Sequence, residues 1–240
     1  MLLVYIFAVI LAAGFLQALT GFGFALVATP LLMIVMSAKE VVIFNILLSS
    51  ILLLIMTYKT RDYPCLPDLK KMIFPCIIGM FVGSCIMGII DDKLLKISIG
   101  IILFLTILQR HINMDKFVKR KISPIETGFY SGFLGASTSL SGPPVFLYFS
   151  NCQEDKNIIR ANLVRFFFFG NLIVLSIFFF FGYLSINFMD IRFWGGIIVV
   201  LIGYFGGNKL FCFISVKWFQ KIGEGIVLLG AIVSIMNGLK

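Results

Sequence analysis

A 17-residue pattern occurs twice in this chain, as GFLQALTGFGFALVATP at residues 14–30 and as GFYSGFLGASTSLSGPP at residues 128–144. When the two copies are superposed, the identical positions are Gly14/Gly128, Phe15/Phe129, Gly21/Gly135, Leu26/Leu140 and Pro30/Pro144. In each copy, glycines and a proline interrupt an apolar stretch. Such interruptions at corresponding places in two halves of a membrane protein indicate the binding site of a transporter.

The composition of the chain is that of a membrane protein. Of its 240 residues, 60% are hydrophobic and 13% are charged, and the mean hydropathy is +1.06. A soluble domain of this size cannot cover so much apolar surface. The apolar runs are long and do not alternate strictly, which favours membrane-spanning helices over the strands of a β-barrel. The sequence therefore predicts an all-α fold, a polytopic transmembrane helical bundle.

The net charge of +9 does not indicate a nucleic-acid-binding protein. The basic residues lie in short loops between apolar segments, as in cytoplasmic loops of membrane proteins, and there is no separate basic domain. The five cysteines are scattered and form no CxxC pair or Cys/His cluster, so neither a disulfide framework nor a metal or other cofactor is expected. The first apolar segment lacks a basic n-region and a clear cleavage site, and we expect it to remain as a membrane helix.

Ten apolar segments are predicted, and most approach the ~20 residues that a helix needs to cross a bilayer. They are residues 2–20, 24–36, 40–58, 72–90, 94–110, 126–140, 143–150, 160–181, 191–208 and 220–237. The segments 24–36 and 143–150 are too short to cross at a rise of ~1.5 Å per residue. Each is expected to be a half-helix after a glycine-rich break, and the sequence leaves open whether it spans fully or re-enters.

The duplication extends over nearly the whole chain. At a spacing of 124 residues, IGMFVG (78–83) matches IGYFGG (202–207). The chain is accordingly divided into a first membrane repeat (1–112), a cytoplasmic linker (113–125) and a second membrane repeat (126–240). The pairs Gly79/Gly83 and Gly203/Gly207 each place small residues on one helix face, and we expect them to serve close helix packing.

Five segments per repeat is an odd number, so the second repeat is predicted to run inverted relative to the first. With the N-terminus outside, the loops at 59–71, 110–125, 151–160 and 209–221 lie inside and hold 14 of the 20 Lys and Arg residues. Because cytoplasmic loops carry an excess of Lys and Arg, this bias favours an inverted repeat with both termini outside.

These features resemble the TauE/SafE family of sulfite and organosulfur permeases. The resemblance rests on the GxG…PLL-like motif that opens each half, at residues 21–32 and 135–146, and on the GxxxG helix toward the end of each half, and it covers essentially all 240 residues. It implies a small multi-pass carrier of the inner (plasma) membrane that moves sulfite, a sulfonate or another small sulfur-containing anion, with export as the expected direction. The usual Gly-Gly-Gly core of each motif is reduced here to GFGF (21–24) and GASTS (135–139), which bears on the substrate more than on the fold.

Anion binding is expected at the broken helices, because a helix N-terminus offers unpaired N–H donors and partial positive charge. Glycine permits close approach of the backbone, and proline fits the first helical turn. The candidate substrate-binding residues are Gln17, Thr20, Gly21, Gly23, Pro30, Asn45, Gly135, Ser137, Thr138, Ser139, Ser141, Gly142, Pro144, Asn162 and Arg165.

For several of these residues a structural role is the open alternative. The hydroxyls of residues 137–141 can instead satisfy backbone groups freed by the broken helix. Arg165 lies inside a predicted span, where it either contacts the anion or snorkels to the cytoplasmic interface. Arg160 is expected to be an interfacial anchor, and Asn171 to make an interhelical hydrogen bond.

Neither catalysis nor coupling to protons is indicated. No Asp or Glu lies at the middle of a predicted span, and the only histidine, His111, belongs to a loop. The chain is therefore not expected to be an enzyme. The alternative to a transporter is a membrane-embedded accessory or assembly protein, which has no need for two broken helices. The expected partners are a small inorganic or organic anion and the lipid bilayer, with a homo-oligomer left open.

Overall fold

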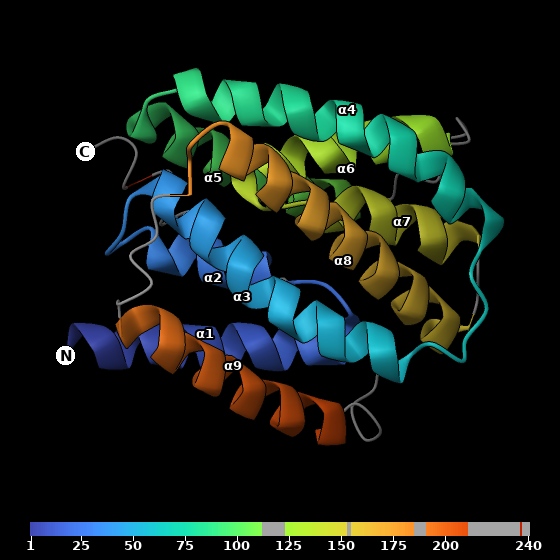
Figure 1. Ribbon diagram of the computed structural model, residues 1–240, viewed down its shortest axis with the longest axis horizontal. Coiled ribbons are helices and arrows are strands. Elements are labelled where there is room, and N and C mark those ends of the chain that lie inside the picture. The colour runs from blue at the N-terminus through green and yellow to red at the C-terminus, as the bar shows by residue number, and fades with distance from the viewer. Residues whose placement is uncertain (112–122, 153–154, 185–190, 211–235, 237–240) are drawn as a thin grey trace.

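The computed structural model describes residues 1–111, 123–152, 155–184, 191–210 and Met236, and within these ranges every regular element is an α-helix. The helices are α1 (Leu2–Thr20), α2 (Phe24–Leu32), α3 (Ala38–Lys59), α4 (Pro67–Ile89), α5 (Asp92–His111), α6 (Pro124–Thr138), α7 (Gly142–Cys152), α8 (Lys156–Phe180) and α9 (Ile191–Leu210). They form a bundle in which α3 and α8 cross between α4 on one side and the α1–α9 pair on the other (Figure 1). The predicted all-α class is confirmed.

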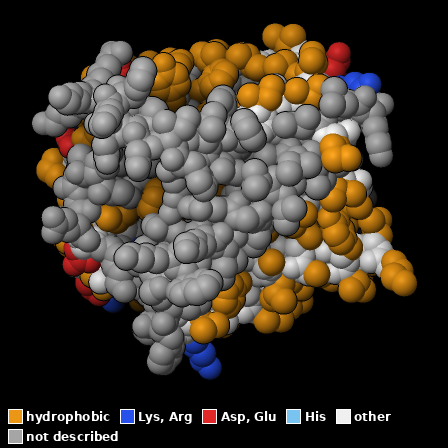
Figure 2. Space-filling model, turned by 180° about the vertical axis from the view of Figure 1, so that it is seen from behind, with side chains coloured by type: hydrophobic (Ala, Val, Ile, Leu, Met, Phe, Trp, Pro, Cys, Tyr) orange, Lys and Arg blue, Asp and Glu red, His pale blue; other side chains and the backbone are white. Residues whose placement is uncertain are grey.

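Five of these helices, α1, α3, α4, α8 and α9, are long and apolar enough to cross a membrane, with mean hydropathy between 1.3 and 2.4. Large apolar side chains such as Phe74, Phe81 and Phe205 point outward from them. Figure 2 shows hydrophobic side chains over most of the described part of one face, with charged side chains near its margins. An apolar surface of this extent is favourable in contact with lipid and unfavourable in water.

Two helix pairs make the most extensive contacts, α4 with α6 and α1 with α9, and glycine brings the backbones together in both. A methyl group at Gly79 would overlap the carbonyl oxygen of Phe129, and one at Gly207 would overlap that of Phe15. The same holds for the other glycine of each pair, Gly83 against α6 and Gly203 against α1. The prediction that the paired glycines serve close packing is confirmed.

The helices α3 and α8 contact one another at the centre, and each is flanked by a short helix. The first short helix, α2, contacts α1 and α3, and the second, α7, contacts α6 and α8. With 9 and 11 residues, they are only about 14 and 17 Å long at 1.5 Å per residue. The prediction of a short helix after each glycine-rich break is confirmed.

Several helix ends differ from the predicted segments, and charged residues account for two of them. The helix α4 begins at Pro67, before the predicted segment 72–90, because Lys70 and Lys71 lower the hydropathy near its start without ending the helix. In the same way, α8 begins at Lys156 rather than at residue 160, with the Asp155 side chain accepting a hydrogen bond from the backbone N–H of Asn157 (2.8 Å). The predicted segment 220–237, apart from Met236, and most of the linker lie outside the described residues.

The described loops that the charge bias assigns to one side of the membrane lie at one end of the bundle. Arg165 of α8 donates to the carbonyl oxygen of Tyr63 in the α3–α4 turn (2.7 Å), and Arg160 links the start of α8 to the ends of α1 and α9. At the opposite end, Lys39 Nζ at the start of α3 donates to the carbonyl oxygen of Gly88 near the end of α4 (3.3 Å). The orientation in the membrane and the inverted relation of the repeats stay predictions.

Candidate functional site

The first break separates α1 from α2 at residues 21–23. α1 ends at Thr20, and Gly21 and Gly23 follow with φ angles of 82° and 108°. Residues with a Cβ rarely adopt this left-handed backbone, so the glycines allow the chain to turn within three residues. Thr20 Oγ1 donates to the carbonyl oxygen of Leu16 (2.8 Å) and also contacts that of Phe22. The hydroxyl of Thr20 is thus used for hydrogen bonds to backbone carbonyl oxygens at the break.

The second break separates α6 from α7 at residues 139–141. Ser139 has a φ of 61°, and its N–H donates to the carbonyl oxygen of Gly135 (3.0 Å), which closes α6. The following helix begins at Gly142 and continues with Pro143 and Pro144. Because proline carries no N–H, α7 offers fewer free backbone donors than α2 does.

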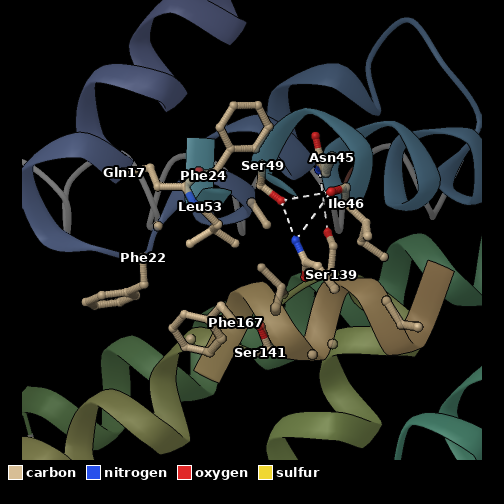
Figure 3. Close-up of a pocket in the computed structure, with 18 of the residues that line it drawn as sticks. Gln17, Phe22, Phe24, Asn45, Ile46, Ser49, Leu53, Ser139, Ser141 and Phe167 are labelled. Carbon is tan, nitrogen blue, oxygen red and sulfur yellow. Dashed lines mark hydrogen bonds between the residues drawn. The ribbon is translucent and has the colours of Figure 1, made fainter. Parts of the chain in front are cut away.

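Both breaks border one cavity of about 50 Å³, shown in Figure 3. A single buried water needs ~10–15 Å³, so the cavity has room for a few waters or one small ion. Its lining is mainly apolar, and its polar side chains are Gln17, Asn45, Ser49, Ser139, Ser141 and Asn171. Within the described part of the chain, no charged side chain lines it.

Two carboxamides at the cavity are buried with an unpaired oxygen. Gln17 is 3% exposed and Asn45 is 1% exposed. Among the described residues, neither Gln17 Oε1 nor Asn45 Oδ1 has a hydrogen-bond partner. An unpaired buried polar atom costs about 1–3 kcal/mol, so it indicates a missing partner such as a water or a ligand. In Figure 3 the Gln17 side chain extends from α1 toward Phe24 at the start of α2.

A hydrogen-bonded cluster beside the cavity joins the two halves of the chain. Asn45 Nδ2 donates to Thr29 Oγ1 (2.9 Å) and to Ser139 Oγ (3.5 Å), and the hydroxyl oxygens of Thr29 and Ser139 are 3.0 Å apart. Ser139 therefore ties the second break to α2 and α3. Thr29 is absent from the sequence candidates, and its place next to Pro30 in the repeated motif is the one signal that points to it.

Asn171 makes the interhelical hydrogen bonds that the sequence predicts. Its Nδ2 donates to the hydroxyls of Ser49 (2.9 Å) and Ser50 (3.2 Å) and to the carbonyl oxygen of Ile46 (3.3 Å), linking α8 to α3. Asn171 and Ser49 also line the cavity, although neither is a sequence candidate for the site. A serine inside an apolar helix commonly bonds back to its own helix, as Ser49 does with Ile46 (3.2 Å), so its type alone gives no signal.

The predicted site residues divide into two groups. Seven lie together around the cavity: Gln17, Gly23, Asn45, Gly135, Ser139, Ser141 and Gly142. Eight do not line it: Thr20, Gly21, Pro30, Ser137, Thr138, Pro144, Asn162 and Arg165. The hydroxyls of Ser137 and Thr138 each donate to a carbonyl oxygen one turn back in α6 at 2.7 Å. Gly21 lies against α8, where a methyl group would come within 2.9 Å of the Arg160 side chain.

Asn162, one of the predicted site residues, lies away from the cavity. It is fully buried, its Oδ1 accepts from the N–H of Leu66 (2.9 Å), and its Nδ2 donates to the carbonyl oxygens of Pro64 (3.0 Å) and Ile158 (2.8 Å). Both ends of this carboxamide therefore hold the α3–α4 turn against α8.

The two arginines of α8 bind helix ends. Arg165 Nη2 donates to three carbonyl oxygens that follow α3, those of Thr60 (2.8 Å), Arg61 (3.1 Å) and Tyr63 (2.7 Å). Arg160 Nη2 donates to the carbonyl oxygen of Ala18 near the end of α1. A cation at a helix C-terminus is stabilised by the negative end of the helix dipole. Arg165 thus reaches toward the loop end of the bundle, the direction that its snorkelling alternative describes, and it also caps the end of α3 there.

The N-termini of both short helices face the cavity. Phe24, Ala25 and Leu26 of the first turn of α2 line it, as does Gly142 at the start of α7. No side chain caps the N-terminus of α2. The first four N–H groups of a helix lack partners within the helix, and each helix N-terminus carries about half a positive charge. The described side chains that line the cavity are therefore uncharged, and the positive ends of α2 and α7 border it together with the negative ends of α1 and α6.

Comparison with known proteins identifies the chain through one family. The model of the sulfite exporter TauE/SafE family matches residues 6–234, which include both breaks and every described residue of the cavity. No curated protein and no solved structure matches the chain. The resemblance found in the repeated motif is confirmed by this match: the chain belongs to the TauE/SafE family of sulfite exporters, which are membrane transporters.

Proposed function

We propose that this chain transports a small sulfur-containing oxyanion, sulfite or a sulfonate, through the cavity between its two broken helices. The observation that carries the proposal is that the N-terminus of α2, which has no side-chain cap, and the buried carboxamide of Gln17, whose oxygen has no partner among the described residues, border one cavity. An anion at this position accepts hydrogen bonds from the first-turn N–H groups, which replace the hydration that it loses.

The polar side chains of the cavity suit an ion with several acceptor oxygens. Gln17 presents an NH₂ group or an oxygen according to the rotation of its terminal torsion, so the same side chain can donate to an oxyanion. Ser141 contributes a hydroxyl from the second break. The surrounding rings of Phe22, Phe24 and Phe167 exclude water, which strengthens each of these hydrogen bonds.

The segregation of basic loops supports a proposal for orientation and direction. We place the end of the bundle that holds Arg61, Lys70 and Lys71 in the cytoplasm, which puts both termini outside the inner membrane. An inside-negative membrane potential then drives an anion outward with ~2.3 kcal/mol per charge per 100 mV. Export by this route requires no titratable group in the cavity.

The test of the transport proposal fills the cavity. The Gly135→Leu substitution places a side chain at the second break, where even the Cβ would lie 3.0 Å from that of Ser141. We expect flux of radiolabelled sulfite in proteoliposomes to fall to background. The matched control is Gly206→Leu, because a Cβ at Gly206 meets only the Phe15 ring at 3.6 Å, an ordinary contact away from the cavity.

Folding of both variants is checked by thermal unfolding in detergent. Full flux in a folded Gly135→Leu protein would remove the cavity from the transport route. Absence of sulfite and sulfonate flux in the unsubstituted protein would favour the accessory or assembly role instead.

A further inference from the structure

The charge inventory of the cavity restricts which ions it can hold. Four of the helices that form it carry charged residues, which are Lys39, Glu40 and Lys59 on α3, Asp68, Lys70 and Lys71 on α4, Glu126 on α6, and Lys156, Arg160 and Arg165 on α8. The helices α1, α2 and α7 carry none. None of these groups lines the cavity in the described part of the chain.

The arginines nearest to the lining residues in sequence are engaged elsewhere. Arg165 precedes Phe166, which lines the cavity, but Arg165 itself does not line it; its Nη2 donates to the carbonyl oxygens of the α3–α4 turn, and its Nη1 is buried without a partner among the described residues. Arg160 donates to Ala18 and, at 3.3 Å, to Asn208 Oδ1. A dehydrated anion in the cavity therefore meets backbone N–H groups and neutral side chains instead of a full positive charge.

The positive potential available to an anion comes from two helix N-termini. Each supplies about half an elementary charge, and the C-terminal ends of α1 and α6 at the same breaks carry the opposite sign, so the helix ends together offset at most about one negative charge. The cost of moving an ion from water into a low-dielectric site rises with the square of its charge in the Born description. A dianion would pay about four times the desolvation cost of a monoanion and keep one negative charge without compensation.

We infer that the cavity selects singly charged oxyanions, hydrogensulfite or a monosulfonate, and rejects dianions such as sulfate and the fully deprotonated form of sulfite. This inference rests on the proposed transport function and narrows its substrate class. The deeply buried carboxamide of Gln17, whose oxygen has no partner among the described residues, supports a ligand at this place independently of the helix ends. Turned about its terminal torsion, it donates to one negative charge without adding a second countercharge.

The test uses two probes whose charge is fixed near neutral pH, methanesulfonate with one negative charge and sulfate with two. Each is added in excess to proteoliposomes that take up radiolabelled sulfite, at one pH. We expect methanesulfonate to inhibit sulfite uptake at a concentration at least about tenfold below that needed for sulfate, a difference of about 1.4 kcal/mol in binding. Equal inhibition by the two ions, or stronger inhibition by sulfate, would overturn the inference.

A variant that adds a positive charge tests whether electrostatics causes the preference for monoanions. The Ser141→Lys substitution adds a cation at the half-buried second break, and Ser141→Gln is its neutral, elongated control. We expect the preference for methanesulfonate over sulfate to fall by about tenfold in the lysine variant and to persist in the glutamine variant. An unchanged preference in a folded lysine variant would contradict the charge argument.

The two proposals fail in different ways. If sulfite flux is present but sulfate competes as well as methanesulfonate, the transport function stands and monoanion selectivity is wrong. If neither sulfite nor methanesulfonate crosses the membrane, the transport function fails and the selectivity inference fails with it.

Discussion

The break between α1 and α2 and the break between α6 and α7 differ in their polar residues and in how those residues are used. Residues 20–24 contain one hydroxyl, whereas residues 137–141 contain four. In the second break, Ser137 and Thr138 bond to their own helix and Ser139 bonds to Thr29. Three of its four hydroxyls are therefore engaged within the protein. In the first break, the N-terminus of α2 is left without a side-chain cap.

This difference shows that the number of polar side chains in a membrane break does not measure how many of them remain free of hydrogen bonds within the protein. Each helix break frees backbone groups, and hydroxyls in the sequence commonly satisfy them. The glycine-rich break has few hydroxyls to do so, and the first turn of α2, which has no side-chain cap, lines the cavity. Ser141 is the hydroxyl of the second break that lines the cavity beside the bonded Ser139.

For the helices with paired glycines, the contacts in the structure and the sequence match align the two halves in different registers. Gly79 of α4 lies against the carbonyl oxygen of Phe129, and Gly207 of α9 lies against that of Phe15. Phe15 and Phe129 correspond in the repeated motif, so by contact Gly79 corresponds to Gly207, at a spacing of 128 residues. The sequence match of 124 residues pairs Gly79 with Gly203 instead. The two registers differ by about one helical turn, which a GxxxG pattern cannot distinguish because its glycines repeat every four residues.

Among the substitutions that test this difference between the two halves, Gln17→Leu in the first half is expected to change sulfite affinity the most. Leucine is close in size and removes a carboxamide that is buried with an unpaired oxygen. We expect the apparent affinity for sulfite to fall by about tenfold, because a hydrogen bond to a charged group contributes about 1.5–3 kcal/mol. Thermal stability in detergent should stay the same or rise, since an unpaired buried polar atom is lost.

Asn162→Leu is the matched control in the second half. This amide is paired at both ends, and its loss leaves the N–H of Leu66 and the carbonyl oxygen of Pro64 without their partner. Stability should fall by about 1–3 kcal/mol while the affinity of the folded protein for sulfite is unchanged. Equal effects of the two substitutions on affinity would abolish the distinction between an open and a structural amide.

The sequence predicts the helical fold and the place of both breaks because these depend on local features. Long apolar runs specify the spans, and glycine with proline specifies the interruptions. The site is predicted only in part. Seven of the candidates converge on the cavity, but the roles of Asn162 and Arg165 depend on the α3–α4 turn, about 100 residues away in the chain. No periodicity or motif within α8 contains that information.

Thr29 and Ser49 were missed for a related reason. Each is a small hydroxyl residue in an apolar helix, and its contacts with Asn45 or Asn171 follow from helix packing. The boundary errors at Pro67 and Lys156 have a different origin, because charged first turns lower the local hydropathy without ending the helix. Tertiary contacts, therefore, decide which polar residues remain available to a ligand.

The Arg165→Gln substitution tests whether Arg165 contributes to stability or to sulfite binding. The guanidinium group bonds three carbonyl oxygens beyond α3, and a neutral, shorter side chain cannot reach all of them. We expect a loss of about 2 kcal/mol in stability, measured by thermal unfolding in detergent, with the same apparent affinity for sulfite. A tenfold weaker affinity at full stability would return Arg165 to the binding site and show that its bonds to the turn are dispensable.

The smallest effects are expected for single hydroxyls of the second break. Ser141→Ala removes a hydroxyl that lines the cavity, and we expect a loss of a few-fold in sulfite affinity, because a neutral hydrogen bond contributes about 0.5–1.5 kcal/mol. Ser137→Ala removes a hydroxyl that bonds back to the carbonyl oxygen of Phe133, which stays bonded within the helix, so affinity should change by less than about twofold. Both are measured as the sulfite concentration at half-maximal uptake in proteoliposomes. A larger loss for Ser137→Ala than for Ser141→Ala would mean that α6 rotates during transport and turns its bonded hydroxyls toward the ion.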